Sequence, residues 1–363
     1  MYNVIMRPRP SWVLLAILLV ACRDGSAPPP NPYPSPFPVV DLGVISSEPR
    51  GGVIGFITTN PSGTLIAGTE VDSLGVTAKG FLWNMGTRTD LGSLGGNTTE
   101  VGAVNDSGQV VGSSKTQTYP FSTHAFLWQK GAMKDLGTLG GINSVAHAMN
   151  NRGQIVGEST TAGDSIHAFL WQNGIMTDLG TLNGGFSSAA LAINDSGDVV
   201  GESWTAFREI HAVLWRKGSI TDLGTTPGCS TAKALNNLGQ IVGETFWRIE
   251  SSYYCNSGPP INTVPVLWRD GVMSSIDNLA DSSTARSMNV GAPAQVVGWF
   301  GTYSTNAHAF VWQNNAKIDL GTLGGPTSYA FSVTYAGDVL GKAELPGTPR
   351  KWHAVFWKVG LPR

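Results

Sequence analysis

Histidine and aspartate recur at a fixed phase along the chain, and both side chains can bind metals or transfer protons. The two sets are His124, His167, His211, His308 and His353, and Asp41, Asp90, Asp135, Asp178, Asp222, Asp277 and Asp319. Catalysis needs groups that converge on one site, whereas a residue present in most copies of a repeat supports the repeat itself. We therefore interpret both sets as hydrogen-bonding fixtures, and we predict no catalytic residue, no metal site and no cofactor.

Two motifs superficially resemble ligand-binding loops. Gly137–Gly141 and Gly321–Gly325 read Gly-Thr-Leu-Gly-Gly, but strands are expected on both sides, so no helix N-terminus would face a phosphate. Asn105–Gly108 and Asn194–Gly197 read Asn-Asp-Ser-Gly, whose oxygens suit calcium although carboxylates are few. Turn formation explains all four segments, with calcium as the alternative for the second pair.

Residues that depart from the repeat are better candidates for binding. They follow a recurrent strand glycine in three consecutive repeats, where a variable connection begins. Flat rings bury a large area at low entropic cost and Arg presents a planar fork, as carbohydrate or protein recognition requires. The candidate ligand-binding residues are Trp204, Phe207, Arg208, Phe246, Trp247, Arg248, Trp299, Phe300 and Tyr303. The alternative is that these rings only pack over the repeats.

Three glutamates share a phase in neighbouring repeats: Glu158, Glu202 and Glu244. Each follows the recurrent strand glycine directly. We interpret them as solvated strand ends.

A recurring tryptophan defines the elements that position these residues. It stands at 83, 128, 171, 215, 268, 312 and 357, a period of about 44 residues that is typical of a propeller blade. One unit predicts four strands, at Val145–Met149, Gln154–Glu158, His167–Trp171 and Ile175–Leu179. Asn and Gly between them supply the positive φ of hairpin turns. Four short strands per unit favour a radial array of small sheets.

The two ends of the array complement each other. The segment Pro38–Gly43 resembles a fourth strand without a preceding third strand, and the last third strand, His353–Trp357, has no fourth strand after it. Pairing these segments would remove two exposed sheet edges. We predict an all-β fold over residues 38–363, a seven-bladed β-propeller of four-stranded blades closed by the N-terminal strand, which completes the last blade.

The repeat motif carries a family resemblance. Copies of His-Ala-Phe precede Leu-Trp or Val-Trp at residues 124, 167 and 308, followed by Asp-Leu-Gly-Thr-Leu-Gly-Gly and a Gly-Gln-Val-Val-Gly type of segment. Together they closely resemble the HAF repeat of predicted extracellular bacterial proteins, from Val39 onward. Lys79-Gly80-Phe81 and Val264-Pro265-Val266 depart from the pattern. The resemblance implies an exported repeat protein and brings no active site with it.

The N-terminus predicts export. Arg7 and Arg9 precede an apolar run from Trp12 to Ala21 that is too short to span a bilayer. Leu-Val-Ala-Cys at 19–22 resembles a lipobox, which predicts a lipoprotein signal peptide at 1–21 and lipidation of Cys22, with a non-lipidated signal peptide as the alternative. Residues 22–37 form a Pro-rich tether. We expect a lipid anchor in the bacterial cell envelope, at the outer membrane or cell surface.

The two remaining cysteines and the net charge of the chain limit the functions that we expect. In an oxidising compartment Cys229 and Cys255 are expected to form a disulfide, with free thiols as the alternative. The net charge of −2 and the lack of a basic run argue against nucleic acid as a partner. We expect a binding or scaffolding module for a polysaccharide or an envelope protein, and no enzyme. The alternatives are a propeller-based hydrolase or lyase and a purely structural component.

Overall fold

The computed structural model describes residues of the segment Asn31–Arg363. Within it the described residues are 31–32, 34–43, 53–72, 75–84, 86–117, 122–224, 228–247, 262–276, 283–289, 291, 293–301, 306–347 and 351–361. The signal peptide, Cys22 and the tether as far as residue 30 lie outside this set. In the described part of the chain the elements are all strands, so none of them is a helix long and apolar enough to cross a bilayer.

The strands come in groups of four, as the repeat predicts. One group is β10 (Gly140–Met149), β11 (Ile155–Thr161), β12 (Ile166–Gln172) and β13 (Ile175–Gly180), which matches the four predicted strands with a longer first strand. The other bounds are β1 (Val39–Gly43), β2 (Val53–Thr59), β3 (Leu65–Val71), β4 (Ala78–Asn84), β5 (Thr87–Asp90), β6 (Gly95–Val104), β7 (Val110–Thr116), β8 (Thr123–Gln129), β9 (Ala132–Asp135), β14 (Ser188–Ile193), β15 (Val199–Trp204), β16 (Ile210–Arg216), β17 (Ser219–Asp222), β18 (Cys229–Leu235), β19 (Ile241–Trp247), β20 (Asn262–Arg269), β21 (Val272–Ser275), β22 (Ser283–Met288), β23 (Val296–Phe300), β24 (His308–Gln313), β25 (Ala316–Asp319), β26 (Ser328–Val333), β27 (Val339–Glu344) and β28 (Trp352–Trp357).

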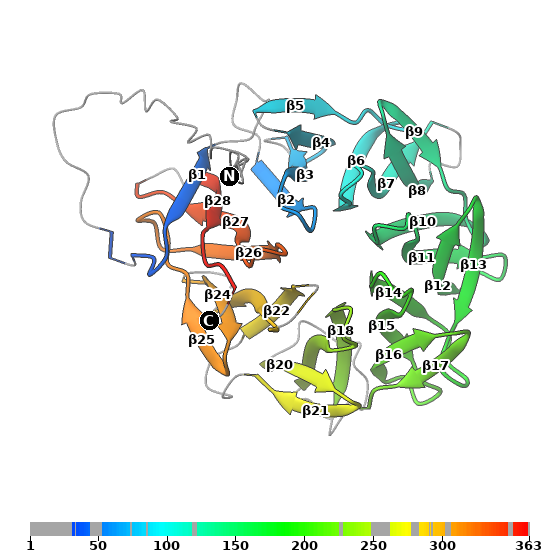
Figure 1. The fold of residues 1–363 in the computed structure, drawn as a ribbon. Coiled ribbons are helices and arrows are strands. Elements are labelled where there is room, and N and C mark those ends of the chain that lie inside the picture. The colour runs from blue at the N-terminus through cyan, green and yellow to red at the C-terminus, as the bar shows by residue number, and fades with distance from the viewer. Residues whose placement is uncertain are drawn as a thin grey trace, which may run out of the picture. The chain divides into compact units, whose positions relative to one another are not determined.

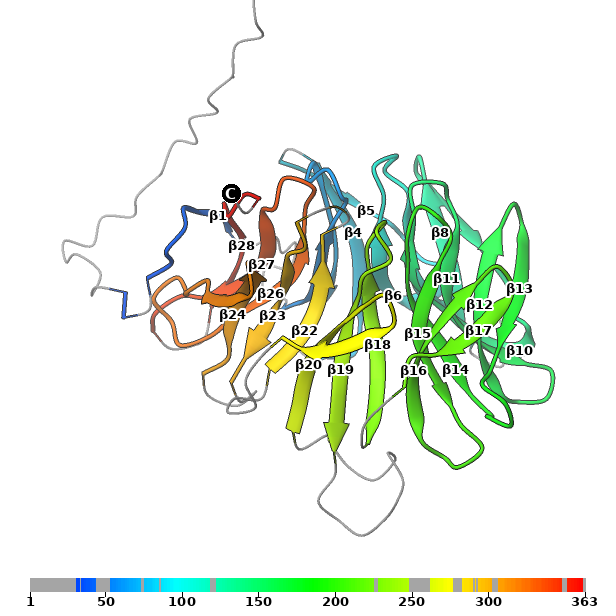
Figure 2. The same ribbon diagram turned by 60° about the horizontal axis from the view of Figure 1, so that its bottom comes forward.

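Antiparallel pairing joins each group into a sheet. Five sheets have four strands, and one eight-stranded sheet combines β2–β5 with β6–β9 through a single parallel bridge between Ala78 and Thr98. The sheets follow one another around a common centre, with β2, β6, β10, β14, β18, β22 and β26 innermost (Figure 1). Each innermost strand contacts the next one, and β26 contacts β2. Figure 2 shows neighbouring sheets, such as β14–β17 and β18–β21, packed side by side.

The His-Ala-Phe motif has a structural role for each of its residues. The His167 Nδ1 atom lies 2.8 Å from Asp178 on the next strand, which ties β12 to β13. The Ala168 N–H donates to the Ser188 hydroxyl of the following sheet at 2.9 Å. Phe169 is fully buried opposite Gly157 of β11. The same His–Asp pairing occurs at His124–Asp135, His211–Asp222, His308–Asp319 and His353–Asp41.

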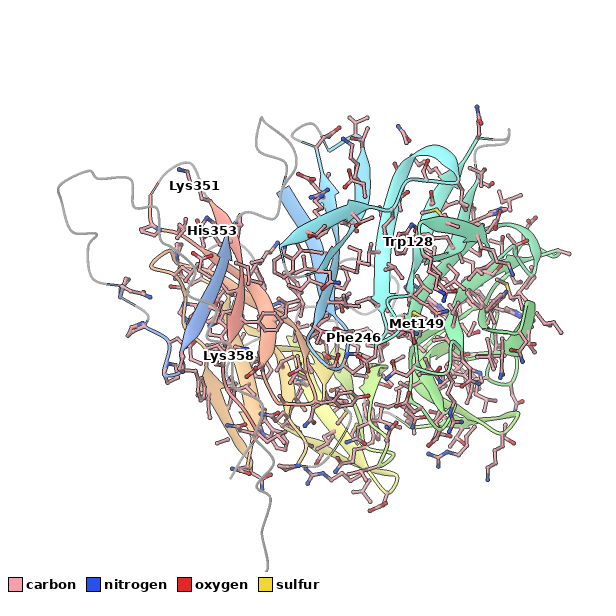
Figure 3. All side chains as sticks on the ribbon, turned by 45° about the horizontal axis from the view of Figure 1, so that its top comes forward. Trp128, Met149, Phe246, Lys351, His353 and Lys358 are labelled. Carbon is pink, nitrogen blue, oxygen red and sulfur yellow. The ribbon has the colours of Figure 1, made fainter. Side chains whose placement is uncertain are left out.

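The last of these pairs joins the two ends of the array. Strand β1 pairs antiparallel with β28, with Val39 opposite Trp357 and Val40 opposite Phe356. His353 on β28 lies beside β1, 2.9 Å from Asp41 (Figure 3). Val39 and Val40 also pack against buried residues of two hydrophobic clusters. The first strand and the last therefore share one sheet with β26 and β27.

Candidate functional site

Two turns in neighbouring sheets have the same backbone. Between β11 and β12 the Asp164 N–H donates to the Thr161 carbonyl at 3.1 Å, and the φ of Asp164 is 61°. Between β15 and β16 the Arg208 N–H donates to the Thr205 carbonyl at 3.0 Å, and the φ of Arg208 is 62°. In both turns the threonine hydroxyl accepts a further bond from the N–H two residues later. The chain thus builds one turn twice.

The side chains of the two turns differ. Where the first turn has Gly163 and Asp164, the second has Phe207 and Arg208. Phe207 is 80% exposed, and Arg208 occupies a positive φ that Asp adopts more readily than Arg. Because Gly163 and Asp164 form the same turn, the backbone of the second turn does not require Phe207 or Arg208.

Aromatic rings extend this surface. Trp204, at the end of β15, lies 4.8 Å from Phe186 between ring centroids, and Phe186 is 49% exposed. Phe186 lies in the connection before β14 and was not among the candidate ligand-binding residues. The sequence could have indicated it, because the preceding repeat has Ile142 at this position. We call Phe186, Trp204, Phe207 and Arg208 the β15–β16 patch.

The other candidate residues have different surroundings. Trp299 contacts Tyr329 and Phe331 edge-on, at 5.4 and 6.4 Å. Phe300 contacts His308 and Phe310, at 5.9 and 6.5 Å, and its ring lies 4.7 Å from the Lys317 ammonium. Phe246 is half-buried, whereas the Trp247 side chain, Arg248 and Tyr303 lie outside what the structure describes. The rings that Trp299 and Phe300 contact are therefore not those of the β15–β16 patch.

The structure describes only one of the two cysteines that are expected to form a disulfide. Cys229 is the first residue of β18 and is buried. It is disulfide-bonded. Cys255 lies outside the described residues, and its pairing with Cys229 stays a prediction.

A bulge recurs on the innermost strands. Their register against the second strand shifts by one residue, for example between Ala232 and Ala234 and between Ala285 and Ser287. An unpaired bulge residue can present its side chain away from the ladder. Here the bulge residues border a central cavity, and all but the two glycines differ from one another: Gly55, Gly102, His147, Leu191, Lys233, Arg286 and Phe331.

This cavity has a volume of about 650 Å³, and residues of all the innermost strands line it. Phe56 and Phe331 contribute rings 5.9 Å apart. Among the charged lining residues, Glu100 and Arg286 are exposed, and the Arg286 guanidinium lies 5.4 Å from the centre of the Phe56 ring. Lys233 is instead half-buried and paired with Glu244 at 2.6 Å. The cavity thus combines an aromatic surface with two exposed groups of opposite charge.

The prediction that the three glutamates are solvated strand ends is wrong. The Glu244 side chain is 6% exposed and the Glu158 side chain 35%, with Glu158 3.9 Å from His147. Burial raises the pKa of Glu202; the Thr231 hydroxyl opposes this, the Glu158 carboxylate adds to it, and Lys233 and His147 oppose it more weakly. The alternation of the second strand points these side chains towards the innermost strands rather than to solvent.

Aromatic rings gather around Lys342, which occupies the corresponding position in the sheet of β26–β28 and β1. Tyr329 lies 5.7 Å from Trp352, and the Lys342 ammonium lies 5.0 to 5.7 Å from the rings of Tyr329, Phe331 and Trp352. Burial lowers the pKa of Lys342. Together with Phe56, this group makes one side of the centre aromatic while the glutamates lie on the other.

The turns after the innermost strands form a polar network. Asn150 Nδ2 donates to the Asn194 carbonyl at 2.9 Å, and Asn194 Nδ2 to the Asn236 carbonyl at 3.1 Å. The carboxylate oxygens of Asp106 and Asp195 accept bonds from neighbouring turns. Turn chemistry thus engages the oxygens considered for calcium, and the described residues contain no group of three or more potential metal ligands.

Tyr335 extends across these turns. Its N–H donates to the Pro61 carbonyl at 2.7 Å, and its hydroxyl bonds to Asn151 at 3.2 Å, although Asn151 is 184 residues away in the sequence. Burial raises the pKa of Tyr335, and the Asp195 and Asp106 carboxylates add to this effect. Tyr335 therefore spans one end of the central region.

Comparison with known proteins gives the fold. No model of a protein family and no curated protein matches the sequence. The structure is similar to the β-propeller domain of the Trilobed protease from Pyrococcus furiosus, with a TM-score of 0.55 and 10% identity over 85% of this chain and 96% of that one. It is also similar to a puromycin-hydrolysing peptidase of Mycobacterium tuberculosis, with a TM-score of 0.55 and 12% identity over 86% and 53% of the two chains. A puromycin hydrolase gives a TM-score of 0.56 at 11% identity over 84% and 52%.

The chain spans about half the length of the two peptidases. At these identities the likeness concerns the fold alone. The protein has a β-propeller fold.

Proposed function

We propose that this protein is a binding module whose β15–β16 patch recognises a polysaccharide. The observation that carries the proposal is the turn built twice, because its second copy places Phe207 and Arg208 where the first shows that Gly and Asp suffice. Phe186 and Trp204 add neighbouring rings. Sugar rings have flat apolar faces that stack on exposed aromatic side chains, so a row of such rings suits a glycan chain.

The rest of the architecture fits a rigid support for this patch. We propose that the propeller has seven blades and is closed by β1, and that it belongs with the HAF-repeat proteins. Lipidation of Cys22 and the Pro-rich tether would hold it at the cell envelope. Mass spectrometry of the mature N-terminus tests the anchor: a diacylated Cys22 supports it, and an unmodified or uncleaved N-terminus contradicts it.

A hydrolase is the less favoured alternative. Glu158 and Glu202 are neighbouring carboxylates with different surroundings, as acid and base catalysis requires. The residues that line the cavity include neither of them. We therefore propose recognition rather than turnover.

The test of recognition exchanges one turn for the other. In the variant Phe207→Gly/Arg208→Asp, the β15–β16 turn acquires the side chains of the β11–β12 turn, and the fold should be kept. We expect binding to an array of bacterial and plant polysaccharides to fall about tenfold or more, since loss of an exposed aromatic contact costs about 1–3 kcal/mol. Ile175→Ser, which removes a 68% exposed side chain elsewhere, is the control and should bind normally.

The melting temperature separates recognition from packing. An unchanged melting temperature with lost binding supports the patch. Equal binding by the exchanged and original proteins, or no glycan binding by either, would overturn the assignment to polysaccharide.

A further inference from the structure

The central cavity forms a second site, separate from the β15–β16 patch. Its special character lies in the bulge positions, which carry glycine in two copies and five different side chains in the others. In a repeat protein, structural needs recur in each copy, so side chains that differ at one shared position are not explained by the repeat. The volume of about 650 Å³ is that of a small-molecule site.

Two charges in the cavity are presented to solvent. Glu100 of β6 and Arg286 of β22 are both exposed, and they come from sheets separated by β2–β5 and by the sheet of β26–β28 and β1. The remaining charged groups that line the cavity, Lys233 and His147, are less accessible, since both side chains are half-buried. A ligand would therefore meet one carboxylate and one guanidinium on separate strands.

The surface near Arg286 is apolar. Arg286 stacks over Phe56, which contacts Phe331, and Leu191, Leu235 and Met288 line the same cavity. An Arg guanidinium pairs well with a carboxylate because its planar fork offers two parallel donors. A ligand that fits needs a cationic group for Glu100, a carboxylate for Arg286 and an apolar body.

We propose that the central cavity binds a small zwitterion with apolar side chains, namely a short apolar peptide or amino acid. The ligand's ammonium faces Glu100, its carboxylate faces Arg286, and its side chains lie against Phe56 and Phe331. Access is from the end opposite to Tyr335, whose hydroxyl bond to Asn151 spans the other end.

Isothermal titration with three probes tests the charge requirement. The probes are the dipeptide leucyl-phenylalanine, its N-acetyl form, which lacks the ammonium, and its C-terminal amide, which lacks the carboxylate. We expect the free dipeptide to bind about tenfold more tightly than either blocked form, as a charge-assisted hydrogen bond is worth about 1.5–3 kcal/mol. Equal affinity for all three probes, or no measurable binding of any, would overturn the proposal.

Two variants assign each charge to its partner. Glu100→Gln should weaken the free dipeptide about tenfold and leave the N-acetyl form unchanged, while Arg286→Gln should weaken the free dipeptide and leave the amide unchanged. Both side chains are exposed, so the fold should be kept. Glu209→Gln, which removes a carboxylate outside the cavity lining, is the control. Equal losses of affinity for all three probes in both variants would contradict the assignment. Both variants should bind glycans as the original protein does, which keeps this test independent of the β15–β16 patch.

Discussion

At the residue scale, one position explains most of the chemistry at the centre. The residue after the recurrent glycine of the second strand is Thr69, Ser113, Glu158, Glu202, Glu244, Trp299 or Lys342 in successive copies. These side chains contact innermost strands: the Thr69 hydroxyl accepts a bond from the Val101 N–H of the neighbouring sheet at 2.9 Å, and Glu244 pairs with Lys233 of its own sheet. Identical backbone geometry therefore brings different side chains to the same place around the centre.

Glu202 should destabilise the folded protein when ionised. Burial raises its pKa, so the folded state binds this proton more tightly than the unfolded state. Its contribution to stability is then present in acid and lost as pH rises through the raised pKa. We expect Glu202→Gln to raise the melting temperature by about 1–3 °C at pH 8 and to have little effect at pH 4.

Thermal unfolding followed by circular dichroism at both pH values checks this prediction. Asp164→Asn, a similar change at an exposed turn, is the control. A gain of equal size at pH 4 would show that the effect is not the ionisation of Glu202.

At the element scale, the glycine of the second strand is required by the bulge opposite. A Cβ atom at Gly157 would lie 1.9 Å from the Val145 carbonyl, and one at Gly201 would lie 1.9 Å from the Ala189 carbonyl. The backbone could not move far enough to relieve such a contact without breaking the hydrogen bonds between the first and second strands of the sheet. The motif Val-Val-Gly thus reflects a steric limit imposed by the neighbouring strand, while Phe169 fills the space beside the glycine.

Gly157→Ala should therefore be severely destabilising. We expect a loss of about 3–5 kcal/mol in the free energy of unfolding, or no soluble protein. Gly163→Ala is the matched control in the same repeat, since a Cβ there meets only the Thr161 hydroxyl at 3.9 Å. Denaturant titration of both variants checks the difference, and a loss below about 1 kcal/mol for Gly157→Ala would contradict the steric argument.

At the scale of the whole molecule, strand β1 links the ends of the chain. It supplies a fourth strand to the sheet of β26–β28, and Val39, Val40 and Leu42 pack against buried residues. Without β1 the edge of β28 would be exposed, and an unpaired edge invites aggregation. The His353–Asp41 pair adds a side-chain link between the ends.

Removal of residues 1–43 should lower the melting temperature by about 5–10 °C, because half-buried Val and Leu side chains each contribute on the order of 1 kcal/mol or more. Removal of residues 1–30 alone, which leaves Asn31 bonded to the Thr322 carbonyl, should have no such effect. Differential scanning calorimetry of both truncations makes the comparison. Equal melting temperatures would mean that β1 does not hold the ends together.

The sequence by itself determined the strands, the propeller type of fold and the pairing of β1 with β28, because short-range turn chemistry and a regular period specify each unit locally. It also indicated that His and Asp are fixtures, and the His167–Asp178 bond agrees with this. Only the tertiary structure decided what faces the centre. The bulge that exposes Arg286 depends on the register between β22 and β23, and the pKa of Glu202 depends on burial and on the Thr231 side chain of the neighbouring sheet. The sequence shows neither beyond variation between copies of the repeat.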